Sequence, residues 1–583
     1  MTAAAVRGDV STTRSRRRIR FSSGSAGLAL PALLFLAIFA IYPLVTFAIG
    51  SVWVRGAFTW VNYTQLFTST YFGGVLLRTI LTALTVMAVC VAIGYPLAYF
   101  LNRVPGRAKV ILIALVVLPY LTSVLVRVFA WSALLGLRGP INTVLVALGI
   151  FDQPQQLGHS FAGALIGLVH VLTPIAVLTM WATMSRIERG HEVTAGALGA
   201  SPVRVFATIF LPLSMPGVIA AALLVYVLAI GAYVIPVALG ATNGLLFAQV
   251  VADQATVTLN WGLAGSMTVA MLIVSLLPLL LVRLVQAIAG RRRNPYPLRN
   301  RLATRSVYPA FELVPTPVWT WLFRVVAVLV LAFLVIPEIV VIIFSFGPFN
   351  SLSIPPDYWS VEGYQRFFAD DRWTEPMGRS FAFAAADGVI ALVLGGLAAY
   401  GLARSSGRVF AIGLAILAFP LALPEVVPAL SFYVFANTFH LAGTSVAVII
   451  GQAVTAIGLA AVISSTVIRN IPVNLEYASQ MSGASKTKTL LRIVAPLALP
   501  GLIVAGLYAF LNAFDNLVLP LFVSGVNSTV PVKMFFSMQD QLNSVIAVVA
   551  TLLIGLLLAA TAIAVLLMSR ATARIDVADV AKG

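Results

Sequence analysis

The sequence predicts an all-α polytopic membrane protein with about twelve transmembrane helices, arranged as two parallel six-helix repeats. Of its 583 residues, 60% are hydrophobic and only 10% are charged, whereas a soluble globular protein carries about 25% charged residues. Apolar runs of membrane-spanning length recur along the whole chain, and residues of the first half recur in the second half at fixed distances. A soluble enzyme, a disulfide scaffold and a disordered chain are therefore excluded.

Twelve apolar runs are long enough to cross a hydrocarbon core about 30 Å thick, which takes roughly 20 helical residues. Proline and glycine interrupt many of them, and membrane helices tolerate this because neighbouring helices satisfy the freed backbone groups. The predicted spans lie near residues 27–50, 76–101, 110–134, 161–184, 213–240 and 263–289 in the first half, and near 320–346, 380–403, 409–438, 443–468, 497–524 and 544–568 in the second.

The basic residues predict the orientation of these spans. If the N-terminus is cytoplasmic, 27 of the 37 Lys and Arg fall on the cytoplasmic side, which is the side that carries the excess of basic residues in membrane proteins. We therefore expect both termini to be cytoplasmic. The net charge of +18 would also suit nucleic acid, but no aromatic or motif context accompanies the basic clusters, so no nucleic-acid partner is expected.

The two halves repeat at two fixed offsets. At an offset of 301, Tyr99, Arg103 and Pro119 recur as Tyr400, Arg404 and Pro420; at an offset of 284, Glu192, Gly199 and Pro212 recur as Glu476, Gly483 and Pro496. The change of offset assigns 17 extra residues to the first half, which we place in the external stretch 137–160. Such regular matches indicate an internal duplication. Since each unit has an even number of spans, the two repeats run in the same direction, with a pathway between them.

The pattern divides the chain into five segments. We expect a basic cytoplasmic N-terminus at 1–26, a first six-helix repeat at 27–289 with a patterned loop at 185–212, and a cytoplasmic linker at 290–319. A second repeat at 320–568 carries the matching loop at 469–496, and a cytoplasmic tail follows at 569–583.

These two patterned loops are longer than a connector requires. They read HEVTAGALGASPVRVFATIFLPLSMPG from His191 and LEYASQMSGASKTKTLLRIVAPLALPG from Leu475. We expect a short helix, a Gly-Ala-Ser turn and a second short helix before the next span. Gly199 and Gly483 suit a backbone with positive φ, and Ser201 and Ser485 suit an N-cap. Such an element resembles a docking surface for a cytoplasmic partner; the alternative is a pair of surface helices without a partner.

With these loops the sequence resembles the membrane permeases of ABC importers. The signature of that family is EAA, three residues, Gly, nine residues and Ile-x-Leu-Pro; here EAA is degraded in both loops, Leu of the second Ile-x-Leu-Pro is replaced by Ala495, and an acid stands one place before each EAA position. The resemblance implies a MetI-like permease domain in each repeat and contact of the loops with an ATPase. The loop residues it assigns to this coupling are Glu192, Gly199, Ala200, Ser201, Ile209 and Pro212 in the first half, and Glu476, Gly483, Ala484, Ser485, Ile493 and Pro496 in the second.

The resemblance also implies the partners. They are a cytoplasmic ABC ATPase dimer, an extracytoplasmic substrate-binding protein, a small-molecule substrate and the lipid bilayer of a bacterial inner membrane. The segment GASKTKT (Gly483–Thr489) lacks the second glycine of a P-loop, so we expect no cofactor on this chain and no catalytic residues; ATP and Mg²⁺ would bind the partner ATPase. With one cysteine and four scattered histidines, no metal site is expected.

Within the importers, the resemblance is to the spermidine/putrescine permease group. It is carried by Leu118–Asn142, Leu423–Phe432 and Ala513–Gly525, and it implies polyamine-like cations as cargo. Iron(III), thiamine and phosphonate importers are related alternatives. From another class, an ion-coupled secondary transporter with two parallel six-helix repeats is an alternative, although such carriers usually place their signature loop between the second and third spans, where this chain has only RVPGRAK and RSSGR.

Ionisable residues inside the predicted spans mark the candidate pathway, because a charge at membrane depth usually faces the bundle interior or an aqueous cavity. Glu425, Asp515, Arg127 and Asn512 are the residues that we expect to line a cation pathway. A structural role, in which these acids pair with Arg127 or cap helix kinks, remains open. For Glu338 and Asp387 the structural role is favoured.

Overall fold

The computed structural model describes residues 26–54, 56–240, 244–292 and 317–580, and most of this chain is helical. The predicted N-terminal segment lies outside these residues except for Ala26. Most of the predicted linker lies outside them as well. The helix α14 (Trp261–Arg292) runs past the predicted end of its span, and α27 (Ser544–Val580) runs through most of the predicted C-terminal tail.

The first half contains the following helices and one small hairpin. They are α1 (Leu30–Leu36), α2 (Tyr42–Gly50), the antiparallel strands β1 (Trp53–Val54) and β2 (Ala57–Phe58), α3 (Val61–Thr68), α4 (Thr70–Arg103), α5 (Gly106–Leu121), α6 (Val124–Leu134), α7 (Pro140–Ala147), α8 (Phe161–Met184), α9 (Arg189–Ala197), α10 (Pro202–Val205), α11 (Leu211–Ile230), α12 (Val234–Leu239), α13 (Phe247–Thr256) and α14.

The second half repeats this order without a counterpart of α7. Its helices are α15 (Pro317–Ser345), α16 (Glu362–Ala369), α17 (Asp371–Ile390), α18 (Gly396–Ala403), α19 (Gly407–Ala418), α20 (Val426–Thr438), α21 (Ser445–Arg469), α22 (Val473–Met481), α23 (Lys486–Thr489), α24 (Ala495–Asp515), α25 (Val518–Val523), α26 (Val530–Asp540) and α27. The helix α7 lies in the stretch to which the sequence assigned the extra residues of the first half.

The prediction of about twelve spans is confirmed in number, although two of the spans are not straight. Ten helices of the described chain are long and apolar enough to cross a membrane, and two bent pairs raise the number to twelve. The pair α5–α6 bends by 91°, and α19, prolonged to Ala422, meets α20 at 92°. The spans predicted at 110–134 and 409–438 therefore correspond to bent pairs of helices, and not to one continuous helix each. The second bend contains Pro424, which lacks a backbone donor and disfavours a helical conformation for the residue before it.

Two further predicted spans differ at both ends from the observed helices. The spans predicted at 213–240 and 497–524 end early, at Ile230 and Asp515, and a short helix follows each break. At the other end, the second short helix of each patterned loop is continuous with the span instead of separate. A π-helical turn precedes Pro212 and another precedes Pro496. A proline ring clashes with the carbonyl four residues before it, and a π-turn is one way in which a helix continues past such a site.

Matching polar contacts show that the two halves share one architecture. The Thr79 hydroxyl accepts a hydrogen bond from the Phe247 amide at 2.8 Å. At the equivalent place in the second half, the Ser380 hydroxyl accepts one from the Val530 amide at 2.9 Å. Each contact fixes the start of a short helix, α13 or α26, against the long helix of its own half.

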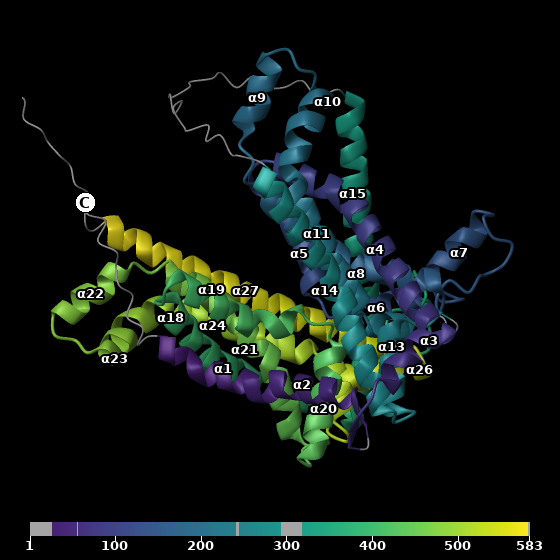
Figure 1. Ribbon diagram of the computed structural model, residues 1–583. Coiled ribbons are helices and arrows are strands. Elements are labelled where there is room, and N and C mark those ends of the chain that lie inside the picture. Colours follow the sequence, from purple (N-terminus) through teal and green to yellow (C-terminus); the bar gives the residue numbers. More distant parts are fainter. Residues whose placement is uncertain (1–25, 55, 241–243, 293–316, 581–583) are drawn as a thin grey trace, which may run out of the picture.

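The first helices of the two halves are exchanged. The N-terminal segment packs α1 against α18 and α21 of the second half, whereas α15 packs against α4, α5 and α6 of the first half. Ala29 and Ala32 are fully buried in the first of these contacts, and such small residues let membrane helices approach closely. The two repeats are thereby interlocked (Figure 1).

The halves form two arms that diverge from the region around α6 and α20 (Figure 1). The arm of the first half ends at α9 and α10, and the arm of the second half ends at α22 and α23. The patterned loops therefore lie at the free ends of the two arms, on the side where the arms are apart.

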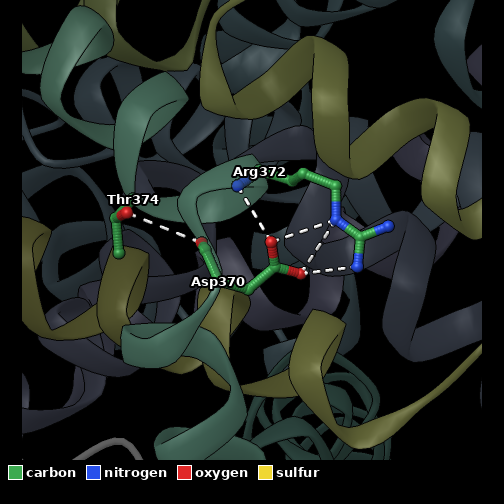
Figure 2. A network of polar contacts seen from close by, with 3 residues as sticks. All are labelled: Asp370, Arg372 and Thr374. Carbon is green, nitrogen blue, oxygen red and sulfur yellow. Dashed lines mark hydrogen bonds and ion pairs between the residues drawn. The ribbon is translucent and has the colours of Figure 1, made fainter.

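The start of α17 is fixed by a polar network outside the apolar part of that helix (Figure 2). The Asp370 carboxylate caps the helix by accepting a hydrogen bond from the Arg372 amide at 2.9 Å, and it also accepts one from the Arg372 Nη2 at 2.9 Å. The Thr374 hydroxyl donates to the Asp370 carbonyl at 3.5 Å. The hydrogen bonds from Arg372 hold the pKa of the Asp370 carboxyl below its ordinary value.

Candidate functional site

The first patterned loop (185–212) and the second (469–496), called here the signature loops, turn in the same way. The φ angle is +86° at both Gly199 and Gly483. After Gly199, the Ala200 amide donates to the Ala195 carbonyl at 3.1 Å. After Gly483, the Ala484 amide donates to the Ser479 carbonyl, also at 3.1 Å. This is the Schellman end of a helix, in which glycine takes the left-handed conformation, so the prediction of positive φ at both glycines is confirmed.

A serine caps the second short helix of each signature loop. The Ser201 Oγ accepts a hydrogen bond from the Arg204 amide at 3.4 Å, and the Ser485 Oγ accepts one from the Lys488 amide at 3.2 Å. These contacts confirm the predicted N-caps. The conformation of each turn is therefore encoded by its Gly-Ala-Ser sequence, and α9 and α22 are held at a defined angle to the helices that follow.

The acid of each signature loop pairs with an arginine at the end of the long helix before it. Glu192 pairs with Arg103 of α4. The Arg404 Nε donates to Glu476 at 2.7 Å, and the Tyr400 hydroxyl donates to the other oxygen of Glu476 at 3.0 Å. Only 7% of each acid side chain is exposed. We call each of these ion pairs an acid–arginine clamp.

The clamps tie the signature loops to the transmembrane arms. One clamp joins α9 to the end of α4, and the other joins α22 to the end of α18. The sequence shows both arginines and both acids as repeated residues, but the arginines repeat at an offset of 301 and the acids at 284. Because the two offsets differ, the repeat pattern alone does not indicate that they pair.

The remaining loop residues of the sequence prediction lie along the joining helices. Ile209 and Ile493 lie in the π-helical turns, and Pro212 and Pro496 lie in the first turn of the span that follows. Their position supports a structural role in the continuous helix. Their contact with an ATPase remains a prediction.

The outer edge of each signature loop exposes a large apolar side chain. Leu198 is 84% exposed in the first loop, and Met481 is 90% exposed in the second. Each signature loop thus exposes one large apolar side chain beside its turn, although the two are not repeat equivalents: Leu198 corresponds to Ser482, and Met481 to Ala197.

A cavity of about 700 Å³ lies between the halves, where the bends and breaks of the spans meet. All four predicted pathway residues line it: Arg127 from α6, Glu425 at the start of α20, and Asn512 and Asp515 at the end of α24. The sequence therefore identified side chains that the fold brings together. Most of the remaining lining is apolar or aromatic.

Arg127 is buried in the wall of this cavity, with 3% of its surface exposed. Its guanidinium donates hydrogen bonds to the backbone carbonyls of Thr122 at 3.1 Å, Ser123 at 3.4 Å and Val171 at 3.4 Å. Among the ion pairs within 4.0 Å in the described part of the chain, none includes Arg127. Backbone carbonyls thus hold its charge in place and leave the acids of the cavity free of a direct pair with it.

The other two membrane-depth acids are not lining residues of the cavity. Glu338 accepts a hydrogen bond from the Thr122 hydroxyl at 2.8 Å, which joins α15 to the bend between α5 and α6. Asp387 is fully buried in α17, and neither of its carboxylate oxygens has a hydrogen-bond partner. The contact of Glu338 supports the structural role favoured by the sequence, whereas the geometry suggests no role for Asp387.

Comparison with protein families decides the class of the chain. The family model described as "Binding-protein-dependent transport system inner membrane component" matches residues 90–294 and 391–573. The chain belongs to this family. The double match confirms that each half is a MetI-like permease domain, and the protein is a multi-pass membrane component of a binding-protein-dependent transport system.

Individual relatives match about one half of the chain each. The spermidine/putrescine transport system permease protein PotB of Escherichia coli K12 is 32% identical over 227 residues, which are 39% of this chain and 82% of the relative. The putrescine transport system permease protein PotI of the same organism is 29% identical over 260 residues, which are 42% of this chain and 90% of the relative. This coverage is what two fused permeases would give.

Solved structures give a more distant match. A bacterial alginate ABC transporter in complex with an alginate-bound periplasmic protein is similar at a TM-score of 0.40 and 15% identity, over 46% of this chain and 94% of the other.

Proposed function

We propose that this chain forms the complete transmembrane pathway of an ABC importer and that its cargo is a polyamine-like organic cation. The observation that carries the proposal is the duplicated signature loop, with the same Schellman turn, the same serine cap and the same acid–arginine clamp in both halves. Each loop presents one docking surface, so the two loops on one polypeptide would engage the two subunits of an ATPase dimer.

In this proposal, ATP and Mg²⁺ bind the partner ATPase and not this chain. Closure of the ATPase dimer on ATP draws the two signature loops together. The clamps pass this movement to α4 and α18, so the arms that diverge in Figure 1 close, and the cavity opens on the opposite face. The signature loops, both termini and the linker at 290–319 would then be cytoplasmic in a bacterial inner membrane.

A substrate-binding protein would deliver cargo on the face opposite the signature loops. Helices α3 and α7 lie away from both signature loops (Figure 1), and we place the docking surface of the binding protein on them. No stretch of the second half corresponds to α7, so the two halves would offer the binding protein different surfaces.

The cavity and the relatives support an organic cation as cargo. The acids Glu425 and Asp515 and the aromatic residues Tyr120 and Tyr508 all line the cavity, and a protonated amine gains from both carboxylates and ring faces. The related permeases PotB and PotI carry spermidine and putrescine in their names. Phosphonate, an anion, would meet two acids in this cavity. Iron(III) and thiamine remain to be compared by experiment.

Reconstitution tests the proposal directly. The full chain is placed in proteoliposomes with its partner ATPase and binding protein, and uptake of radiolabelled spermidine, putrescine, thiamine, iron(III) and phosphonate is measured with and without ATP. We expect uptake of the polyamines that requires ATP and the ATPase. Uptake driven by an ion gradient without nucleotide would contradict the importer and favour a secondary transporter.

A further inference from the structure

The cavity is built from two equivalent contacts between the halves. A break at the end of α11 faces the bend before α20, since a Cβ atom at Gly231 would lie 2.6 Å from the Cβ of Pro424. A break at the end of α24 faces the bend between α5 and α6, since Asp515 lies near the Ser123 side chain and the Val124 amide, and all three residues line the cavity. Asp515 is the repeat equivalent of Gly231, and Pro424 is that of Ser123.

The charged residues break this internal symmetry. At the offset of 301, Arg127 corresponds to Pro428 and Glu425 corresponds to Val124; at the offset of 284, Asp515 corresponds to Gly231. Each ionisable group of the cavity wall therefore has a neutral counterpart in the other half. The two contacts therefore differ in charge: Glu425 adjoins Pro424 at the first contact, whereas Arg127 and Asp515 lie at the second.

Arg127 is the one basic side chain among the described lining residues of the cavity, and it shares this lining with the acids Glu425 and Asp515. Its guanidinium is held by carbonyls of its own half, as described above, so it stays in place when a ligand approaches the acids. The Asp515 Oδ1 is buried and has no hydrogen-bond partner. An ammonium group that reached this oxygen would do so beside a fixed positive charge.

Resting on the proposed function, we infer that Arg127 lowers the affinity of the pathway for its cationic cargo, because its fixed positive charge offsets part of the attraction of the two carboxylates. A pathway must bind its cargo strongly enough to admit it and weakly enough to release it. Two carboxylates in a partly dehydrated cavity would retain a polyamine. The guanidinium offsets part of their attraction and repels the cargo directly, so cargo leaves when the cavity opens.

Direct binding tests this role. The full chain is purified in lipid nanodiscs, and equilibrium binding of radiolabelled spermidine is measured for the wild type and for Arg127→Gln. At an effective dielectric constant of about 20, removing a unit charge a few ångströms away strengthens binding of a cation by at least about tenfold. We therefore expect spermidine to bind Arg127→Gln at least tenfold more tightly, and Arg127→Lys, which keeps the charge, to bind like the wild type.

Arg283→Gln is the matched control, because Arg283 lies on α14 with an exposed side chain and does not line the cavity. Its spermidine affinity is expected to equal that of the wild type. Unchanged or weaker binding by Arg127→Gln would overturn the inference.

A second comparison serves if Arg127→Gln alone does not fold. The double variant Arg127→Gln/Asp515→Asn loses one charge of each sign, and it is compared with Asp515→Asn. We expect the double variant to bind spermidine about tenfold more tightly than the single one, because Arg127 is absent from it. Equal or weaker binding by the double variant contradicts the inference.

The two proposals fail in different ways. If the wild type takes up no organic cation with ATP, the proposed function is overturned. If the wild type takes up polyamines and the Arg127 variants show no gain in affinity, only the role of Arg127 is overturned.

Discussion

Two glycines set the geometry of the signature loops at the scale of single residues. Gly199 and Gly483 both have a φ of +86°, where an L-residue costs roughly 1–2 kcal/mol. We expect Gly199→Val and Gly483→Val each to reduce stimulation of the partner ATPase by the reconstituted chain severalfold, because the second short helix must tilt to relieve the strain. Membrane insertion should be unaffected.

Gly190→Ala in α9 provides the matched control. This glycine lies in the same loop, has an ordinary helical φ, and has nothing within 4 Å of the position that a Cβ atom would occupy. Its replacement should leave ATPase stimulation unchanged. If the two Gly→Val variants behaved like this control, the turn would have no part in coupling.

The acid–arginine clamps predict an asymmetric response to mutation. In the second clamp the side chains of Arg404 and Glu476 are 8% and 7% exposed, whereas Arg103 in the first clamp is 31% exposed. Removing one partner of a buried pair costs about 3–5 kcal/mol. Glu476→Gln should therefore lower the melting temperature in detergent more than Glu192→Gln does.

The double variant Arg404→Met/Glu476→Met separates stability from coupling. Apolar replacement of both partners of a buried pair is often nearly neutral, so it should melt close to the wild type while ATP-driven uptake falls. Normal uptake by a stable double variant would show that the clamp does not transmit force.

At the scale of elements, the breaks of the spans decide where the cavity lies. A Cβ atom at Gly231 would meet Pro424 at 2.6 Å from its Cβ and 2.8 Å from its Cα, so the α11–α12 break would have to move away from the bend before α20. Gly231→Ala is expected to cost about 1–3 kcal/mol through overpacking and to abolish cargo uptake.

Gly555→Ala in α27 is the control for this substitution. Gly555 lies in the middle of a spanning helix, and a Cβ atom added there would have nothing within 4 Å. Thermal melting and uptake of this variant should match the wild type. If Gly231→Ala retained uptake, this would contradict the close packing of the α11–α12 break against the bend before α20.

The sequence predicts the number of spans at this scale but not their bends. Hydropathy measures the length of an apolar run and contains no information on its direction. Proline does not resolve the question either, because Pro96 lies inside α4 and Pro174 inside α8, both of which are continuous helices. The bends depend on contacts with the opposite half, which no local pattern reveals.

At the scale of the whole molecule, the duplication was predictable from the sequence and the exchange of first helices was not. Fixed offsets identify equivalent residues, but they do not say which half a helix packs against. Arg127, Glu425 and Asp515 could be grouped in advance because a charge at membrane depth has few stable locations. The clamps required the structure, since their members repeat at different offsets.

The central claim is that an ATPase moves the two signature loops relative to each other. It is tested by spin labels on Arg186→Cys and Asn470→Cys, two exposed and repeat-equivalent positions at the start of the signature loops; the one native cysteine, Cys90, is buried. The distance between the labels is measured by double electron–electron resonance in nanodiscs that contain the partner ATPase and binding protein. Trapping the ATPase with ATP and vanadate should shorten this distance. An unchanged distance in a complex that still transports, or a change that follows an ion gradient without nucleotide, would contradict the account.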